Sequence, residues 1–190
     1  MAAIEALGQR AIAVKGHVAD PQTAQIVVAK AVEAFGKVDV MVSNAGICPF
    51  HGFLDMPTDV VERTFKVNLH GAYFMVQAAA QQMVKQGHGG SIVAVSSISA
   101  LVGGEYQTHY TPTKAGVHSL SQQLRCDLYG RHVRVTEVSP ARVETEVFGR
   151  LIGNMEEAKK RFFDEYESLL PEDIANSVAF AVLAPQRMNV

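Results

Sequence analysis

Residues 90–114, GSIVAVSSISALVGGEYQTHYTPTK, determine how the rest of the chain is interpreted. They open with an apolar, β-branched run at 92–95, which predicts a short buried strand. Hydroxyl residues and a glycine-containing loop follow, and a helical pattern begins near Tyr110. Pro112 fits the first turn of such a helix, where a missing N–H carries no penalty. We therefore expect a strand, a loop and a helix, with Tyr110 and Lys114 on one face of that helix.

The spacing of Tyr110 and Lys114 has a chemical use. A free tyrosine has a pKa of roughly 10, so it is a poor base at neutral pH. An ammonium group held nearby stabilises the phenolate and lowers that pKa. A serine at the end of the preceding strand, Ser97 or alternatively Ser96, would then hold a substrate oxygen beside the phenol. The same spacing is also common on solvated helix faces, so the pair alone identifies no site.

Further motifs, in the right order, make the pattern specific. The serine, tyrosine and lysine at 97, 110 and 114 resemble the active-site motif of the short-chain dehydrogenase/reductase family, strand–Ser…Tyr-x-x-x-Lys. Upstream, Ser-Asn-Ala-Gly at 43–46 resembles the Asn-Asn-Ala-Gly turn of that family, and Asn68 resembles the asparagine of its catalytic tetrad. Downstream, Ser-Pro-Ala-Arg-Val-Glu-Thr at 139–145 resembles the family segment Pro-Gly-x-Val-x-Thr. The chain is identified as a member of this family, of the classical type.

The resemblance implies a fold, an activity and a set of site residues. The implied fold is an α/β, Rossmann-like, doubly wound parallel sheet, forming one partial domain over residues 1–190. The implied activity is NAD(P)-dependent interconversion of a secondary alcohol or sugar hydroxyl and a carbonyl by hydride transfer, with NAD or NADP left open. The implied catalytic residues are Asn68, Ser97, Tyr110 and Lys114. The implied cofactor-binding residues are His17, Val18, Asn44, Ala45, Gly46, Tyr110, Lys114, Pro140, Val143 and Thr145.

Each catalytic residue has an implied role. Tyr110 would exchange a proton with the substrate oxygen, and Ser97 would bind that oxygen. Lys114 would lower the pKa of Tyr110 and hold the ribose hydroxyls of the cofactor. Asn68 would hold a water that connects Lys114 to solvent. For His17, a plain strand-to-helix loop is an equally good interpretation.

The substrate class is divided between two branches of the family. Residues 43–118 resemble rhamnose-type sugar 1-dehydrogenases. Residues 124–130 and 171–175 are more similar to the branch that oxidises serine and 3-hydroxy acids with NADP. The two parts of the chain therefore favour different substrates.

The cofactor fingerprint of the family, Thr-Gly-x-x-x-Gly-x-Gly, does not occur in this sequence. We therefore expect a first strand–helix–strand unit of roughly 30 or more residues to be missing, together with a last strand beyond 189–190. Residues 10–15 alternate weakly and predict a strand, which would then lack a neighbour, while the strand at 38–42 would become an exposed edge. The alternative function is a catalytically silent fragment or subunit that pairs with a full-length relative.

The remaining elements follow from hydrophobic patterning. The strand at 38–42 is almost wholly apolar, which predicts helices on both of its faces. A helix at 21–35 would be capped by Asp20, and 132–138 and 171–183 predict a further strand and helix. The helix that begins at Pro57 is apolar on nearly every side, which indicates burial from two directions. In the family, helices like 57–86 and 110–130 form the dimer interface, so a homodimer or homotetramer is expected.

Composition excludes several other classes. The chain is 48% hydrophobic with a formal net charge of −2 and no basic stripe, so neither nucleic acid nor membrane is an expected partner. It opens without the apolar region of a signal peptide, and its two cysteines give no disulfide framework, which suits the cytoplasm. The seven histidines lack metal-ligand spacing, so no metal is expected. For His51, a position in a solvated loop is favoured over a role in substrate binding. Without a Gly-x-Ser-x-Gly elbow, a serine hydrolase is set aside.

Overall fold

The computed structural model describes residues 1–164, 167–185 and 188. Residues 189–190, after which a last strand is expected, lie outside the described residues, so that strand stays a prediction. In chain order the elements are α1 (Ala2–Glu5), α2 (Pro21–Phe35), β1 (Val40–Ser43), α3 (Thr58–Phe65), the π-helical turn η1 (Lys66–His70), α4 (Gly71–Gln86), β2 (Gly90–Val95), the 3₁₀ turn η2 (Ile98–Ala100), α5 (Tyr110–Asp127), β3 (Val133–Val138), α6 (Glu146–Ile152), α7 (Met155–Phe162) and α8 (Pro171–Leu183).

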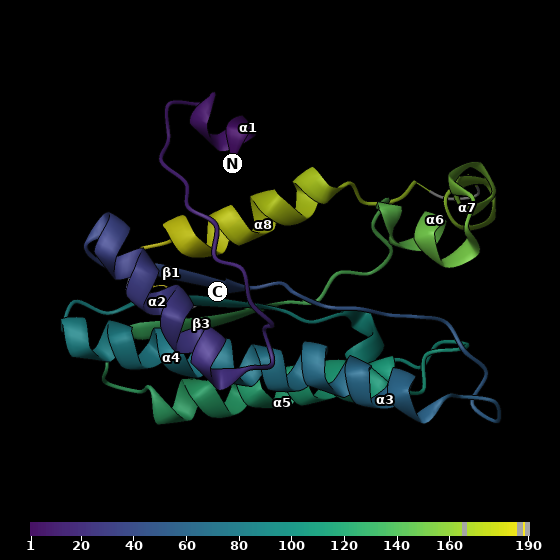
Figure 1. The fold of residues 1–190 in the computed structure, drawn as a ribbon, viewed down its shortest axis with the longest axis horizontal. Coiled ribbons are helices and arrows are strands. Elements are labelled where there is room, and N and C mark those ends of the chain that lie inside the picture. Colours follow the sequence, from purple (N-terminus) through teal and green to yellow (C-terminus); the bar gives the residue numbers. More distant parts are fainter. Residues whose placement is uncertain (165–166, 186–187, 189–190) are drawn as a thin grey trace.

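The strands form one parallel sheet, and helices cover its two faces unequally. The three strands lie in the order β1-β2-β3, with Val42 opposite Val93 and Val93 opposite Thr136. Helices α4 and α5 pack on one face, with α2 against α4, and α8 lies across β2 and β3 on the other (Figure 1). This arrangement confirms the predicted Rossmann-like α/β class.

Several predicted elements are present as expected. Helix α2 begins after Asp20, whose carboxylate accepts hydrogen bonds from the backbone N–H groups of Gln22 and Thr23 at 3.1 and 3.2 Å. The strand predicted at 132–138 is β3, and the helix predicted at 171–183 is α8. Between them lie α6 and α7, in a charged segment at 146–169 whose residues 165–166 lie outside the described residues.

The long helix predicted from Pro57 is present but contains a change of winding. Helix α3 passes through η1 into α4, so the winding loosens over Lys66–His70 and tightens again. The turn lies close to α5 because residue 116 is glycine: a Cβ there would lie 2.8 Å from a methyl carbon of Leu69. Single π turns inside α-helices are frequent at functional sites, and this one contains Asn68.

The N-terminal part of the sheet differs from the sequence-based expectation in two ways. Residues 10–15 do not form a strand, because no described strand lies beyond β1 to pair with them. They run beside α2 instead, where the Arg10 guanidinium donates a hydrogen bond to the Ala34 carbonyl and lies over the Phe35 ring. The prediction that both faces of the 38–42 strand are covered is also wrong, since Val40 and Val42 are 39% and 41% exposed.

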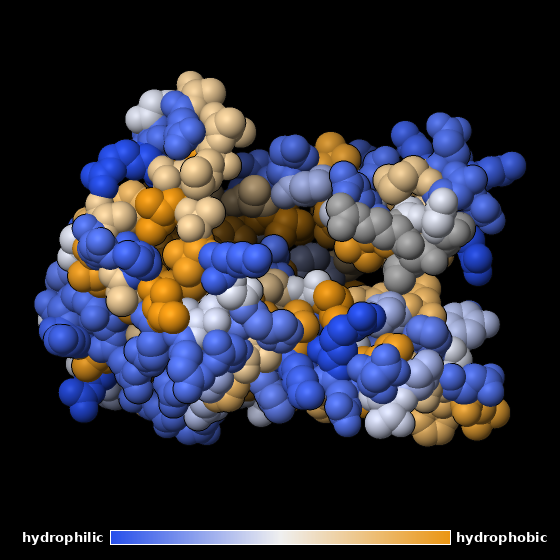
Figure 2. Space-filling model, in the orientation of Figure 1, coloured by the Kyte–Doolittle hydropathy of each residue, from blue (hydrophilic) through white to orange (hydrophobic). Residues whose placement is uncertain are grey.

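The open edge predicted for this strand is confirmed, because among the described strands β1 pairs only with β2. Helix α8 covers β2 and β3 but not β1. In the space-filling view a hollow with hydrophobic walls lies between the N-terminal arm on the left and the α6–α7 region on the right (Figure 2). The sheet is therefore well enclosed at β2 and open at β1.

Candidate active site

The start of helix α5 is fixed to the end of strand β2 by hydrogen bonds in both directions. The ammonium of Lys114 donates to the carbonyl oxygen of Val95 at 2.8 Å. The hydroxyl of Ser96 donates to the carbonyl oxygen of Lys114 at 3.1 Å and is 3% exposed. Ser96 is therefore used in joining strand and helix, and the geometry favours Ser97 over Ser96 as the serine available to a substrate.

Ser97, Tyr110 and Lys114 are brought together at the carboxyl edge of the sheet. Burial raises the pKa of the Tyr110 hydroxyl to about 12, although a hydrogen bond with the Ser97 side chain lowers it and the Cys48 thiol adds a smaller increase. The Lys114 nitrogen lies 5.7 Å from the centre of the Tyr110 ring. The predicted serine–tyrosine–lysine cluster is thus present in space.

The prediction that Lys114 lowers the pKa of Tyr110 is wrong. We expected a lowered tyrosine pKa, whereas the structure raises it and Lys114 is not among the causes. The ammonium donates to the Val95 carbonyl and lies over the Tyr110 ring. The raised pKa of Tyr110 comes chiefly from the loss of hydration of the phenolate on burial.

Lys114 is itself strongly affected by its surroundings. Its exposed fraction is 5%, and burial lowers the pKa of its ammonium to about 8, partly opposed by the nearby Cys48. Burial in turn raises the pKa of the Cys48 thiol to about 12, with Lys114 acting in the opposite direction. A buried lysine with a pKa this close to neutral is a candidate functional group.

Asn68 connects the loop after β1 to helix α5. Its side chain is 1% exposed. Its amide oxygen accepts a hydrogen bond from the Ile47 N–H at 2.8 Å, and its amide nitrogen donates to the Ile47 carbonyl at 2.8 Å. The same nitrogen donates to the Thr113 hydroxyl at 3.1 Å, and that hydroxyl donates to the Tyr110 carbonyl at 2.6 Å. Asn68 therefore fixes the loop next to the tyrosine, while its predicted water contact stays a prediction.

The predicted cofactor turn follows β1 and reaches this cluster through Gly46. Asn44, Ala45 and Gly46 are all exposed. A Cβ placed on Gly46 would lie 3.5 Å from the amide oxygen of Asn68 and 3.7 Å from the Lys114 nitrogen. An ammonium has three N–H donors, and the Val95 carbonyl accounts for one. Lys114 therefore has N–H donors beside the turn 44–46 that suit the hydroxyl groups of a ligand.

The third predicted segment, at 139–145, is joined to the cluster through η2. The Pro140 carbonyl accepts a hydrogen bond from the Ile98 N–H at 2.9 Å, next to Ser97. Val143 forms an isolated parallel bridge with Leu169. Thr145 is the half-buried N-cap residue of α6 and makes no side-chain capping bond. Their predicted contact with the cofactor stays a prediction.

The contacts described for His17 and Val18 lie at the starts of two helices. The Nδ1 atom of His17 accepts a hydrogen bond from the Ala19 N–H at 3.2 Å in the turn before α2. Val18 packs against Gly71, where an added Cβ would lie 2.7 Å from a Val18 methyl carbon. A role of these residues in cofactor binding stays a prediction.

Two site residues were missed by the sequence reasoning. Thr113 links Asn68 to Tyr110, and the signal for it was the tendency of threonine in a helix to bond a carbonyl one turn earlier. Cys48 lies near enough to Tyr110 and Lys114 to affect the pKa of each. No sequence motif indicated Cys48, because its position depends on how the loop after β1 folds over α5.

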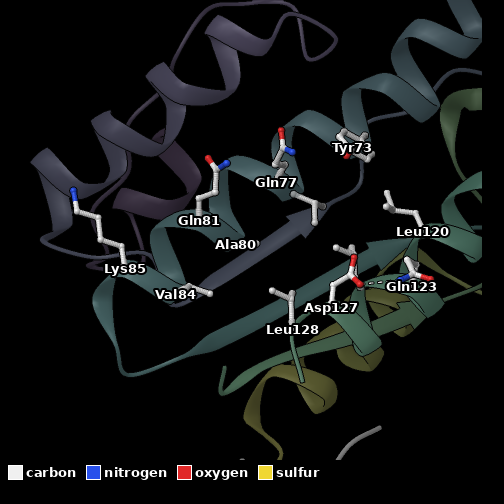
Figure 3. Close-up of a pocket in the computed structure, with 12 residues that line it drawn as sticks. Tyr73, Gln77, Ala80, Gln81, Val84, Lys85, Leu120, Gln123, Asp127 and Leu128 are labelled. Carbon is white, nitrogen blue, oxygen red and sulfur yellow. Dashed lines mark hydrogen bonds between the residues drawn. The ribbon is translucent and has the colours of Figure 1, made fainter. Parts of the chain in front are cut away.

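A separate groove of about 630 Å³ lies between α4 and α5 (Figure 3). It is lined by side chains that include Tyr73, Gln77, Leu120 and Leu128, and by none of the predicted site residues. It coincides with the surface predicted as a subunit interface. Over the described ranges, no three side chains converge as a metal ion would require, and no helix is both long and apolar enough to cross a membrane.

Comparison with known proteins decides the family. A family model for short chain dehydrogenases matches residues 1–155. The chain belongs to the short-chain dehydrogenase family. It is therefore an oxidoreductase of this type, as the sequence motifs predicted. The Rossmann-like parallel sheet with flanking helices is the fold of this family as it occurs here.

Individual relatives of this short-chain dehydrogenase support the same placement. The chain is 69% identical over 185 residues to an L-rhamnose 1-dehydrogenase (NAD(P)(+)) from Sphingomonas sp. (strain SKA58), covering 95% of this chain and 72% of the relative. It is 49% identical over 179 residues to an L-rhamnose 1-dehydrogenase (NAD(P)(+)) from Azotobacter vinelandii, covering 93% and 70%. The predicted similarity of 43–118 to rhamnose-type enzymes is confirmed.

Solved structures show the same fold. A short-chain type dehydrogenase/reductase from Mycobacterium marinum superposes with a TM-score of 0.88 at 27% identity, covering 99% of this chain and 75% of that chain. A serine dehydrogenase complexed with NADP+ superposes with a TM-score of 0.85 at 24% identity, covering 93% and 72%. The second likeness shows the fold alone. It therefore does not support serine as the substrate, although residues 124–130 and 171–175 resemble that branch of the family.

Proposed function

We propose that this short-chain dehydrogenase oxidises the C1 hydroxyl of L-rhamnose, or of a closely similar sugar, with NAD or NADP as hydride acceptor. The observation that carries the proposal is the 69% identity to an L-rhamnose 1-dehydrogenase over almost the whole chain. The geometry supports it, because Ser97, Tyr110 and Lys114 lie together at the edge of the sheet where parallel α/β sheets bind ligands. At C1 the hydroxyl belongs to a hemiacetal, so its oxidation yields a lactone.

Tyr110 takes the proton of the C1 hydroxyl in this proposal. General-base catalysis of this kind contributes about 10²–10⁴-fold to a rate. The Ser97 hydroxyl, which already interacts with the Tyr110 hydroxyl, holds the same substrate oxygen and orients it. Because burial raises the pKa of Tyr110, we expect sugar oxidation to speed up as pH rises through the alkaline range.

Lys114 and the turn 44–46 hold the ribose side of the cofactor in this proposal. The residues fit such a group, since the Lys114 ammonium has N–H donors beyond the one that binds the Val95 carbonyl, and the exposed turn 44–46 lies beside it. The nicotinamide supplies the hydride acceptor when it is bound. Asn68 keeps the turn in place through Ile47. The sequence contains no glycine-rich turn of the fingerprint type, so we assign no residue to the pyrophosphate.

The groove between α4 and α5 is the proposed contact between subunits of a homodimer or homotetramer (Figure 3). The support is its apolar lining together with the 47% exposure of Tyr73. Replacement of Leu120 by arginine would place a charge in this groove and is expected to lower the mass of the particle in sedimentation equilibrium.

We also propose a cytoplasmic location, which the free thiols Cys48 and Cys126 support.

The test is a substrate panel on the purified 190-residue chain. L-rhamnose, L-serine and 3-hydroxybutyrate are each offered with NAD+ and with NADP+, and reduced cofactor is followed by its absorbance. The proposal predicts turnover of L-rhamnose at least about 10²-fold above the two acids, because a site built to bind several sugar hydroxyls discriminates strongly against partners that lack them. Turnover of an acid but not of the sugar would refute the substrate assignment.

A further inference from the structure

His109, the residue directly before Tyr110, is a buried histidine whose ring nitrogens make no hydrogen bond of normal geometry. Its exposed fraction is 3%, and neither Nδ1 nor Nε2 makes a hydrogen bond of normal geometry. A neutral imidazole carries one N–H donor and one acceptor nitrogen. Most buried polar groups in native proteins are paired, because an unpaired one loses its hydration without compensation. The position of His109 therefore calls for a physical reason.

The groups that face His109 belong to the loop 47–53. Burial lowers the pKa of the imidazole, the Pro49 carbonyl raises it, and the nearby His51 lowers it further. The net effect is a lowered pKa, so the ring is neutral at pH 7 and has one N–H to donate. The Pro49 carbonyl is the acceptor beside it.

The loop 47–53 is fixed on either side of Pro49. At its start, Asn68 binds both backbone groups of Ile47. Further along, the Phe50 ring packs edge-on against Phe148 of α6, with ring centres 6.3 Å apart. Pro49 has no backbone N–H, so its carbonyl is the one backbone group through which a hydrogen bond can hold this position. Cys48, between Ile47 and Pro49, lies beside the catalytic cluster.

We propose that His109 is a positioning residue, whose imidazole N–H binds the Pro49 carbonyl and holds the loop 47–53 against the start of α5. This contact keeps Cys48 in place beside Tyr110 and Lys114. Its catalytic consequence rests on the proposed function, whereas the contact between loop and helix does not. In an active enzyme, loss of the contact would loosen the substrate side of the site and raise KM more than it lowers kcat.

The cysteines provide a direct measurement of the loop position. The chain has two, Cys48 in the loop and Cys126 on the exposed surface of α5. In a Cys126→Ser background, Cys48 is the single thiol, and its burial and raised pKa make it slow to react with a disulfide reagent such as dithionitrobenzoate. His109→Phe keeps the buried bulk but removes the N–H. We expect it to speed up Cys48 labelling about fivefold, the size of effect expected from one hydrogen bond.

His109→Asn and His109→Gln are the matched variants, because each retains an amide N–H, one near the Nδ1 position and the other near Nε2. At least one of them should keep Cys48 labelling within about twofold of the wild-type rate. A role in packing alone predicts the opposite order, with the phenylalanine variant slow and the amide variants fast. That order, or equal rates in all four proteins, would overturn the proposal.

Two further measurements keep the outcome clear. If His109→Phe does not fold, the imidazole nitrogen resonances of the wild-type chain decide: a His109 N–H protected from exchange with solvent supports the contact, and rapid exchange refutes it. The labelling needs neither sugar nor cofactor. A chain that shows the expected labelling rates without sugar oxidation would therefore refute the proposed function while leaving the positioning contact supported.

Discussion

Strands β1 and β2 are neighbours of similar apolar sequence, yet they have different environments. β2 pairs on both edges, and its Ile92 and Val93 are 0% exposed. Among the described strands β1 pairs only with β2, and its Val40 and Val42 remain 39% and 41% exposed. An apolar strand of a parallel sheet is buried only as far as neighbouring strands and helices cover it. A similar apolar sequence therefore produces a core strand at one position in the sheet and an open edge strand at the next.

The catalytic cluster follows the same division. Tyr110 and Lys114 belong to α5 and Ser97 follows the end of β2, and hydrogen bonds to Val95 and from Ser96 join this helix to this strand. The predicted cofactor turn at 44–46 follows β1 and is exposed. The side of the site proposed to handle the proton is thus built on the enclosed part of the sheet, and the side proposed to bind the cofactor lies at its open part.

The largest expected difference between the two strands is in stability. Ile92→Ala removes fully buried methyl groups and should lower the free energy of unfolding by about 3 kcal/mol. Val42→Ala, on the open face of β1, should change it by no more than about 0.5 kcal/mol. Urea unfolding of the two variants measures both values. Losses of equal size would mean that β1 is as well covered as β2 in solution.

Asn68 joins the two regions, so its removal should affect both. Asn68→Ala leaves the backbone N–H and carbonyl of Ile47 without their partners and should lower the free energy of unfolding by about 2 kcal/mol. Asn44→Ala, exposed on the same edge, is the control and should have little effect on unfolding. If the two variants unfold alike, the bridge between the regions does not hold the loop.

Lys114 provides a pH-dependent test of how dry the β2 side is. Burial lowers the pKa of its ammonium from 10.5 to about 8. Between these values the unfolded chain binds more protons than the folded one, so the stability of the wild type should rise with pH. Relative to Lys114→Met, which lacks this titration, the gain from pH 8 to 10 should be on the order of 1 kcal/mol or more. A difference that does not depend on pH would show that Lys114 is hydrated.

Comparing the two proteins removes the contribution of Tyr110, which both contain. Its pKa is raised from 10.0 to about 12. Above pH 10 the folded chain therefore retains a proton that the unfolded chain loses, and stability falls with pH. The two residues act with opposite signs, so a measurement on the wild type alone would combine them.

Most elements of the fold could be predicted, because local sequence determines them. The Asp20 cap and the proline at the start of α8 specify where those helices begin. The strand predicted at 10–15 does not form, because a weak alternation of apolar and polar residues does not stabilise a strand without a neighbouring strand to pair with. The exposed face of Val42 was not predicted for a similar reason, since the helices and strands that cover a face of a strand are not encoded in the strand's own sequence.

The candidate site could be predicted in its residues but not in its electrostatics. Tyr110 and Lys114 lie on one face of α5, as their spacing requires. The predicted direction of the Tyr110 pKa was wrong, because burial raises this pKa and Lys114 is not among its causes. The π turn that presents Asn68 and the unpaired imidazole of His109 carried no sequence signal, since both arise from packing between helices and a loop.

The most direct test of the account compares Tyr110→Phe with Tyr129→Phe for sugar oxidation by the purified chain. Both changes remove one phenolic hydroxyl, but Tyr129 is 89% exposed and lies beyond the C-terminal end of α5. We expect Tyr110→Phe to lower kcat by about 10²–10⁴-fold, whereas Tyr129→Phe leaves it unchanged within about twofold. A Tyr110→Phe variant that folds normally and retains the wild-type kcat would contradict the central claim that this hydroxyl carries the proton.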